Sequence, residues 1–156
     1  MKVLVVVVGR VRGDLAAPVA EYEARAARYW KLEVIEVSAG AGRGQASPEQ
    51  VMEAEAGRIL AKVPPELEVV ALTREGKGMG SRELAGYLEK NAVRASAGVA
   101  FVIGGAFGLD ASVLKRSRRK LSLSTFTLPH EMARLVLAEQ LYRSGTIGRG
   151  EPYHKG

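Results

Sequence analysis

An alternation of strand-like and helix-like segments runs along this whole chain, and it limits the possible folds more than any other feature. Residues 3–8 form an unbroken apolar run, which is typical of a strand covered on both faces. Further strands are predicted at residues 32–37, 67–72, 99–103 and 121–128. Helical patterns separate and follow these strands, so we expect one α/β domain spanning residues 1–156, with a mostly parallel sheet and helices on both faces.

Capping residues mark where the helices are expected to begin, at Asp14, Ser47, Ser81, Asp110 and Pro129. The signal at Ser47 is the most complete, because proline follows at position 48 and glutamine at position 50, as in a capping box. The helices are predicted to end near residues 30, 63, 91 and 118, and the last helix is followed by a loosely structured tail at 145–156.

Composition excludes several classes of site. The chain has no cysteine and two histidines, so a disulfide framework, a thiol nucleophile and a cysteine-based zinc site are ruled out. We expect no metal centre. The longest apolar run is far shorter than the roughly 20 residues that cross a bilayer, and no small-residue cleavage site follows it. We therefore expect a cytoplasmic protein that is not bound to membranes.

The net charge of +6 is concentrated in one third of the chain. The first 104 residues hold 14 basic and 13 acidic side chains, whereas the last 52 hold 9 basic and 4 acidic ones. Such an asymmetry indicates a polyanionic partner, most simply a nucleic acid. A solvated surface that keeps the protein in solution explains the same charge equally well.

Three predicted strands lead into unusual loops, after Leu72, Ile103 and Leu123. Ligands of parallel sheets bind beyond the carboxyl ends of the strands. The second loop carries Gly104-Gly105-x-x-Gly108, whose glycines permit tight turns and close approach of a ligand. The spacing after the first strand does not match a dinucleotide-binding fingerprint, and no nucleotide-binding P-loop is present.

Five of the six residues at 115–120 are basic, in and just after the helix predicted to begin at Asp110. This basic cluster consists of Lys115, Arg116, Arg118, Arg119 and Lys120. It is explained either as a solvated helix end, where cations are favoured, or as a surface that contacts phosphates.

Both histidines lie in the basic third of the chain. His130 begins the last helix beside Pro129, and His154 lies in the tail beside Tyr153. Each histidine is as well explained by a structural role as by a catalytic one. Tyr153 is a candidate for stacking on a nucleic-acid base.

Four motifs together carry a family resemblance. Leu72-x-x-x-Gly76-Lys77 is followed by Ser81-x-Glu83-Leu84-Ala85, and the second motif is the strand 101–103 with its glycine loop. The third runs from Leu121-Ser122 through Thr127-Leu128-Pro129-His130 to Arg134-x-x-Leu137-x-Glu139-Gln140-x-Tyr142-Arg143, and the fourth is Pro152-Tyr153-His154-Lys155. In this order and spacing, over essentially the whole chain, they closely resemble the RlmH family, the ribosomal large-subunit pseudouridine methyltransferases of the SPOUT class.

The resemblance implies a SPOUT fold with a C-terminal trefoil knot, S-adenosylmethionine as methyl donor, and a homodimer with its site at the subunit interface. It implies methylation at N3 of a pseudouridine in 23S rRNA of the assembled ribosome. Thr73 departs from the pattern, because relatives often carry an acid there. The cofactor is expected to lie against Leu72, Gly104, Gly105, Leu123, Ser124, Thr125, Phe126, Thr127 and Leu128.

N3 of a pseudouridine is an imide nitrogen that must lose its proton when it is methylated, so a base is needed, and His154 and His130 are the candidates. Arg143 is the candidate for stabilising negative charge that develops on the target base. RNA contacts are expected from the basic cluster, Arg134 and Tyr153. The alternative functions are a non-catalytic RNA-binding factor of ribosome assembly and, less well supported by the glycines, an enzyme that uses a nicotinamide cofactor.

Overall fold

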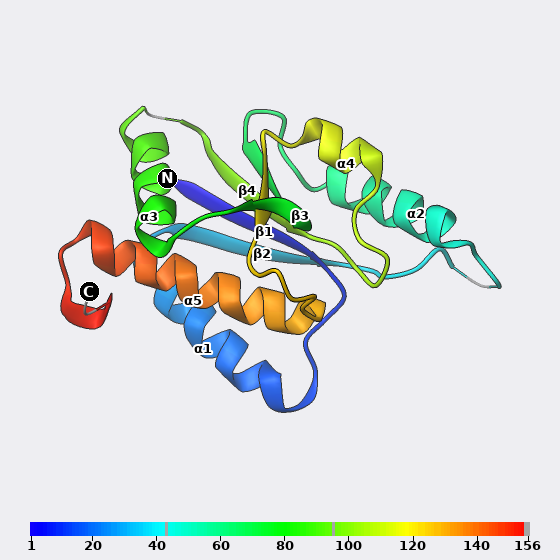
Figure 1. Ribbon diagram of the computed structural model, residues 1–156, viewed down its shortest axis with the longest axis horizontal. Coiled ribbons are helices and arrows are strands. Elements are labelled where there is room, and N and C mark those ends of the chain that lie inside the picture. The colour runs from blue at the N-terminus through cyan, green and yellow to red at the C-terminus, as the bar shows by residue number, and fades with distance from the viewer. Residues whose placement is uncertain (43, 95, 155–156) are drawn as a thin grey trace.

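A single parallel sheet of five strands forms the centre of the molecule, in the order β2-β1-β4-β3-β5 (Figure 1). The computed structural model describes residues 1–42, 44–94 and 96–154. The strands are β1 (Lys2–Val8), β2 (Lys31–Val37), β3 (Glu68–Gly78), β4 (Gly98–Ile103) and β5 (Arg119–Ser122). The expectation of an α/β fold with a parallel sheet is confirmed.

Helices cover both faces of this sheet, as predicted. The helices are α1 (Ala16–Ala26), α2 (Pro48–Leu60), α3 (Ser81–Val93), α4 (Ala111–Arg116) and α5 (His130–Gly148), with 3-10 turns η1 (Gly13–Leu15) and η2 (Pro152–His154). Helices α1, α3 and α5 share one apolar cluster with the sheet, and α2 and α4 share the other.

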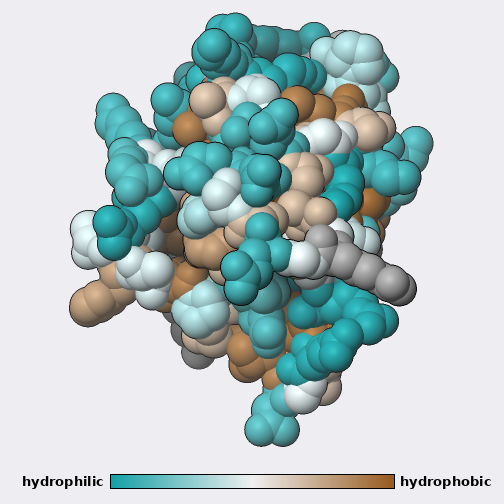
Figure 2. Space-filling view, turned by 90° about the vertical axis from the view of Figure 1, so that its right-hand side faces the viewer, coloured by the Kyte–Doolittle hydropathy of each residue, from teal (hydrophilic) through white to brown (hydrophobic). Residues whose placement is uncertain are grey.

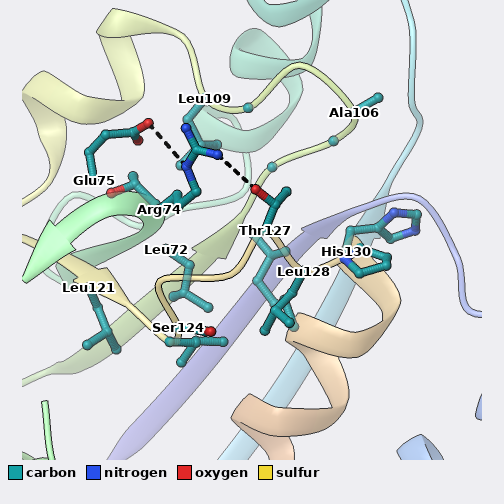
Figure 3. A pocket seen from close by; sticks show the side chains of 18 of the residues that line it. Leu72, Arg74, Glu75, Ala106, Leu109, Leu121, Ser124, Thr127, Leu128 and His130 are labelled. Carbon is teal, nitrogen blue, oxygen red and sulfur yellow. Dashed lines mark hydrogen bonds and ion pairs between the residues drawn. The ribbon is translucent and has the colours of Figure 1, made fainter. Parts of the chain in front are cut away.

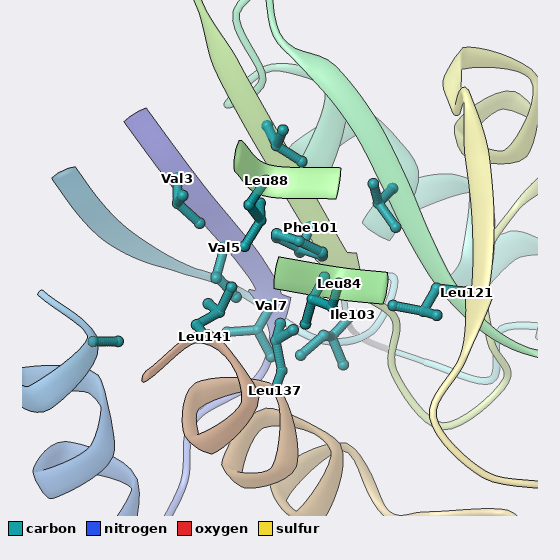
Figure 4. Packing of buried hydrophobic residues seen from close by; sticks show 13 residues of the cluster. Val3, Val5, Val7, Leu84, Leu88, Phe101, Ile103, Leu121, Leu137 and Leu141 are labelled. Atoms are coloured by element: carbon teal, nitrogen blue, oxygen red, sulfur yellow. The ribbon is translucent and has the colours of Figure 1, made fainter. Parts of the chain in front are cut away.

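Two hydrophobic clusters hold the layers together, one on each face of the sheet. Successive residues of β4 alternate between them, because side chains of a strand point to opposite faces: Phe101 belongs to one cluster and Val102 to the other. Leu137 and Leu141 of α5 pack onto the first cluster (Figure 4). Each fully buried leucine contributes about 1.5–3 kcal/mol relative to an exposed one, so α5 is firmly attached to the sheet.

The helix starts follow the predicted caps in part. The Ser47 hydroxyl accepts a hydrogen bond from the Gln50 amide at 3.1 Å, and the Gln50 side chain accepts one from the Ser47 amide at 2.9 Å. Asp110 caps α4 through the amide of Ser112. Two predicted caps are wrong: Asp14 lies inside η1, and Ser81 is the first residue of α3 because Gly80 occupies the capping position.

The third and fifth strands have different ends from those predicted. The chain after Leu72, expected to be a loop, remains in β3 up to Gly78, with a break in register between Leu72 and Lys77. This bulge brings Gly76 against the backbone of Lys120, where an added Cβ would lie 2.7 Å from a backbone atom. The close approach is possible only because residue 76 has no side chain.

The strand predicted at 121–128 ends at Ser122. Side-chain hydrogen bonds replace strand pairing beyond it, since the Ser122 hydroxyl donates to the Ser124 carbonyl and the Ser124 hydroxyl accepts from the Phe126 amide. Such local bonds compete with a sheet ladder. The alternating apolar pattern of these residues therefore belongs to an irregular segment, residues 123–129, which leads into α5.

The end of the chain is more ordered than predicted. Helix α5 continues through Gly145, where an added Cβ would lie only 2.3 Å from the Tyr29 ring. The Trp30 indole donates to the Leu141 carbonyl at 2.9 Å, which also fixes α5 against the end of α1. The expectation of a loose tail is thus wrong for residues 145–154, and residues 155 and 156 lie outside the described residues.

Candidate functional site

A cavity of about 880 Å³ lies beyond the carboxyl ends of β3, β4 and β5 (Figure 3). Its walls come chiefly from residues 72–75, from the loop after β4 and from the chain between β5 and the first turn of α5. These are the three loops that the sequence singled out, and the parallel sheet brings them to one edge. The size falls within the range of pockets that hold small molecules and cofactors.

The interior of this pocket is largely apolar. Its aliphatic lining consists of Leu72, Ile103, Leu109, Leu114, Leu121, Leu123 and Leu128. Two polar atoms of lining residues are buried without a hydrogen-bond partner, the Thr73 hydroxyl oxygen and His130 Nε2. Buried polar atoms normally have partners, so these two atoms are suited to bind a ligand.

Arg74 connects two walls of the pocket. Its guanidinium donates to the Thr127 hydroxyl at 2.9 Å and lies 3.9 Å from the carboxylate of Glu75 (Figure 3). The bond ties the β3 bulge to the 123–129 segment. Arg74 and Glu75 also place one positive and one negative charge at the pocket, next to each other.

The 123–129 segment supplies part of the pocket lining and an exposed aromatic ring. Of the predicted cofactor residues in it, Leu123, Ser124, Phe126, Thr127 and Leu128 line the cavity. The remaining one, Thr125, is exposed and lies outside the lining. The side chain of Phe126 is 80% exposed, so it stands at the rim.

The glycine loop, residues 104–108, forms another wall, and Gly104 and Gly105 both line the cavity as predicted. The loop is closed by a hydrogen bond from the Gly108 amide to the Gly105 carbonyl at 3.1 Å. An added Cβ at Gly105 would lie 3.0 Å from both Glu55 Oε1 and Val8 Cγ1, neither of which lines the pocket. A side chain at 105 would therefore press on the packing behind the loop, and not on the ligand space that the sequence suggested.

The three predicted catalytic residues are separated within one subunit. His130 lines the pocket, and its Nε2 lies 3.2 Å from where a Cβ on Gly9 would stand. Arg143 follows it by 13 residues of the same helix, a rise of about 20 Å. Figure 1 places η2, which contains His154, at the opposite end of α5 from His130.

Arg143 and the tail that follows α5, residues 149–154, form a compact polar group at the C-terminal end of this helix. The Arg143 guanidinium and the Tyr153 hydroxyl both donate to Glu139, at 2.8 and 2.9 Å. The ring of Tyr153 lies 4.5 Å from that of Tyr142. Burial and the bond to Glu139 raise the pKa of Tyr153, and the bond to Glu139 raises the pKa of Arg143. Nδ1 of His154 is buried without a partner.

The basic cluster divides into anchored and exposed members. The Arg116 guanidinium donates to the carbonyls of Pro64, Pro65 and Leu67, which fixes the loop before β3. Arg118 pairs with Glu68 at 3.1 Å, yet its side chain is largely exposed. Lys115, Arg119 and Lys120 are also exposed, and Arg119 stacks over the Tyr87 ring.

Arg134 serves the fold of this subunit. Its guanidinium donates to Glu23 at 2.8 Å and to Glu36 at 2.5 Å, and its side chain is nine-tenths buried. Burial alone lowers the pKa of Arg134, but the bonds to Glu23 and Glu36 together raise it above its ordinary value. Since its donors are committed to these carboxylates, we leave Arg134 out of the RNA-contacting surface proposed below.

Several residues of interest had no clear signal in the sequence. Glu55, Arg74 and Phe107 stand at no fixed position of a motif in the sequence. Only Phe107, a large apolar residue in a glycine-rich loop, suggests an exposed ring, and it is 51% exposed at the pocket.

Within residues 1–42, 44–94 and 96–154, no group of three or more potential metal ligands occurs. None of the helices in that part is long and apolar enough to cross a membrane.

Comparison with known proteins gives matches along the whole chain. The model of a family of predicted SPOUT methyltransferases matches residues 1–154. A Gemmatimonas aurantiaca protein named Ribosomal RNA large subunit methyltransferase H is 51% identical over 156 residues, which cover 99% of this chain and 100% of that protein. A Listeria monocytogenes protein of the same name is 43% identical over 159 residues, with the same coverage.

Among solved structures, a probable methylase family protein from Haemophilus influenzae Rd KW20 superposes with a TM-score of 0.54. The match covers 99% of this chain and 70% of that one, at 13% sequence identity. At this identity the likeness concerns the fold alone, and it agrees with the parallel sheet described above.

Proposed function

Because the chain belongs to the SPOUT methyltransferase family, and within it to the RlmH family of ribosomal RNA large-subunit methyltransferases, we propose that it methylates N3 of a pseudouridine in 23S rRNA, with S-adenosylmethionine as methyl donor. Its action on rRNA as a methyltransferase follows from the family. The nucleotide, the donor and the assembled ribosome as substrate are our proposal. A ribosomal substrate would place the protein in the cytoplasm.

The pocket at the ends of β3, β4 and β5 is the observation that carries this proposal. Its volume and aliphatic lining suit an adenosine. Amides and carbonyls of the irregular 123–129 segment, which lines the pocket, would meet the edge of the adenine. The unpartnered Thr73 hydroxyl is available for a polar group of the ligand. The charges of Arg74 and Glu75 are suited to the carboxylate and ammonium groups of the amino-acid part.

S-adenosylmethionine would supply a methyl group bonded to a positively charged sulfur, and this sulfur is a good leaving group because it departs as a neutral thioether. The protein must align that carbon with N3 and exclude water. The N3–H proton must also be removed as the new carbon–nitrogen bond forms. His130 lines the pocket and is the candidate base, although its Nε2 lies against Gly9 and 4.0 Å from Glu131, so the imidazole would have to turn toward the ligand to accept this proton.

A second subunit is needed if Arg143 and His154 take part, because both lie far along α5 from the pocket of their own chain. We propose a homodimer in which the tail of each subunit, residues 149–154, and Arg143 approach the pocket of the other. Arg143 would then stabilise negative charge on the target base. Figure 2 shows the end of the molecule that lies on the right in Figure 1, away from the tail, and hydrophobic and hydrophilic side chains are interspersed on it.

The same family membership carries the trefoil knot as an expectation. Residues 121–133 pass beside the ends of β3 and β4 before α5 packs on the sheet, and this path is consistent with a knot. A knot would hold the 123–129 segment firmly in place and so preorganise the pocket.

RNA contacts are assigned to Arg118, Arg119 and Lys120, the exposed end of the basic cluster, together with Lys115 and, in the dimer, Tyr153. This surface is small and offers few groups for reading bases. It is suited to phosphates and shape, so an assembled ribosomal particle would supply the remaining contacts by presenting one nucleotide at a fixed place.

Calorimetry with S-adenosylmethionine, followed by transfer of labelled methyl groups to ribosomal particles and to naked rRNA, tests the proposal. We expect binding, and transfer to particles that far exceeds transfer to naked rRNA. Absence of binding would instead favour the non-catalytic RNA-binding alternative. Equal transfer to both substrates would contradict recognition of the assembled particle.

A further inference from the structure

Glu55 is a buried carboxylate outside the pocket. It lies on α2, on the face that contributes Ala56 and Ile59 to the core, and only 3% of it is exposed. A carboxylate in such surroundings is costly unless its oxygens accept hydrogen bonds. The surroundings of its two oxygens therefore indicate why an acid stands here.

One carboxylate oxygen holds the loop after β2. Glu55 Oε2 accepts a hydrogen bond from the Gly40 amide at 2.8 Å. One turn further along α2, the Arg58 guanidinium donates to the carbonyls of Ser38 and Gly40, at 2.8 and 2.6 Å. These three bonds fasten residues 38–40 to α2, so Glu55 is held in place from one side.

The other oxygen, Oε1, is buried without a partner. It lies against the glycine loop, because a Cβ built on Gly105 would be 3.0 Å from Oε1 and 3.1 Å from Oε2. The glycine loop lines the pocket on its opposite side. Glu55 is thus separated from the pocket by the thickness of one backbone segment.

We propose that Glu55 is a positioning residue for the ligand pocket, and that its Oε1 accepts a backbone N–H of the glycine loop when S-adenosylmethionine fills the pocket. The inference rests on the proposed function. An unpaired buried oxygen costs free energy that a hydrogen bond recovers, and a glycine loop turns its amides at little steric cost. Glu55 therefore favours the ligand-bound conformation of the loop.

Glu55→Gln tests this with little change of shape. The glutamine carbonyl still accepts from Gly40, whereas its NH2 group takes the place of Oε1 and cannot accept. We expect the Kd for S-adenosylmethionine to rise about tenfold, the loss of one charge-assisted bond. Glu53→Gln on the exposed side of the same helix is the matched control, and it should bind as the unaltered protein does.

Hydrogen exchange separates this role from a merely structural one. In the unaltered protein, S-adenosylmethionine should slow the hydrogen exchange of the backbone amides at 104–108. In Glu55→Gln this slowing should be lost. The midpoint of thermal unfolding without ligand should nevertheless be the same in Glu55→Gln as in the Glu53→Gln control. A Glu55→Gln protein that binds as tightly, with the same slowing, overturns the proposal. Failure of the unaltered protein to bind overturns the proposed function and this inference with it.

A double-mutant cycle gives an independent test. Gly105→Ala places a Cβ against the Glu55 carboxylate and should weaken binding, but it should cost less in a Glu55→Ala background, where two of its three closest atoms are gone. Thermal unfolding shows whether each variant is folded. If all variants are folded and the two changes in affinity simply multiply, Glu55 does not act through the glycine loop.

Discussion

Mixing two inactive variants tests whether the active site is built from two subunits. Leu72→Arg places a cation on the apolar lining of the pocket, where it blocks the site and repels the sulfonium. His154→Ala removes the tail imidazole. In one subunit, Leu72 of β3 lines the pocket beside the first residue of α5, whereas His154 lies in η2, beyond the last residue of that helix. Arg143 alone is about 20 Å along the helix from His130. A tail that folds on its own helix cannot serve its own pocket without unpacking Tyr153 from Glu139.

The expected activities follow from counting sites in a symmetric dimer. Equal amounts of the two variants, exchanged at random, give heterodimers in about half of the molecules, each with one intact site of two, so about a quarter of the unaltered activity returns. If pocket and tail act within one subunit, nothing returns. Methyl transfer to ribosomal particles measures the outcome, and native mass spectrometry of a tagged partner verifies that heterodimers form.

A reciprocal mixture guards against a misleading result. The unaltered protein is mixed with an equal amount of the doubly substituted chain, Leu72→Arg with His154→Ala. A site shared between subunits leaves only the unaltered homodimers active, about a quarter of the sites, whereas a site within one subunit leaves about half. Heterodimers in the first mixture without recovered activity, or half the activity in the second, would refute the shared site.

Three further predictions concern stability, RNA and titration. Arg134→Met leaves two carboxylates without their cation and should destabilise the fold by about 3 kcal/mol, measured by urea unfolding; a change below about 1 kcal/mol would show that the pairs contribute little. Charge reversal of the three exposed C-terminal members of the basic cluster should weaken particle binding and reduce its salt dependence, and an unchanged salt slope would place the RNA elsewhere. Three tyrosines have a pKa above the ordinary 10.0, so they should ionise at a higher pH than free tyrosine does in a titration followed at 295 nm. The stabilisation of the fold by these neutral hydroxyls is complete below pH 10 and is lost as the pH rises toward their folded-state pKa values. Ionisation of these three hydroxyls at the pH of free tyrosine would contradict this. These three are Tyr29, Tyr87 and Tyr153.

Local patterns in the sequence determined the elements and the general position of the site. An unbroken apolar run at 3–8 specifies a strand covered on both sides, and the residues after Ser47 specify a helix start, because both signals depend on neighbours in the chain. The placement of three loops at one edge follows from the geometry of parallel strands, and the pocket lies there. The family motifs added the reaction, which periodicity alone does not contain.

Only the tertiary structure decided which distant residues meet. Arg134 pairs with carboxylates 111 and 98 residues away, and Gly145 continues a helix because Tyr29 packs against it. The strand predicted at 121–128 ends early because local hydrogen bonds replace a ladder. Glu55 is buried on α2, with Gly40 and the glycine loop lying against its carboxylate. His130 and His154 both lie in the basic third of the sequence, but His130 begins a 19-residue helix and His154 lies in η2, beyond the other end of that helix. Such contacts depend on packing between segments far apart in the chain, where burial and hydrogen bonding outweigh local propensity.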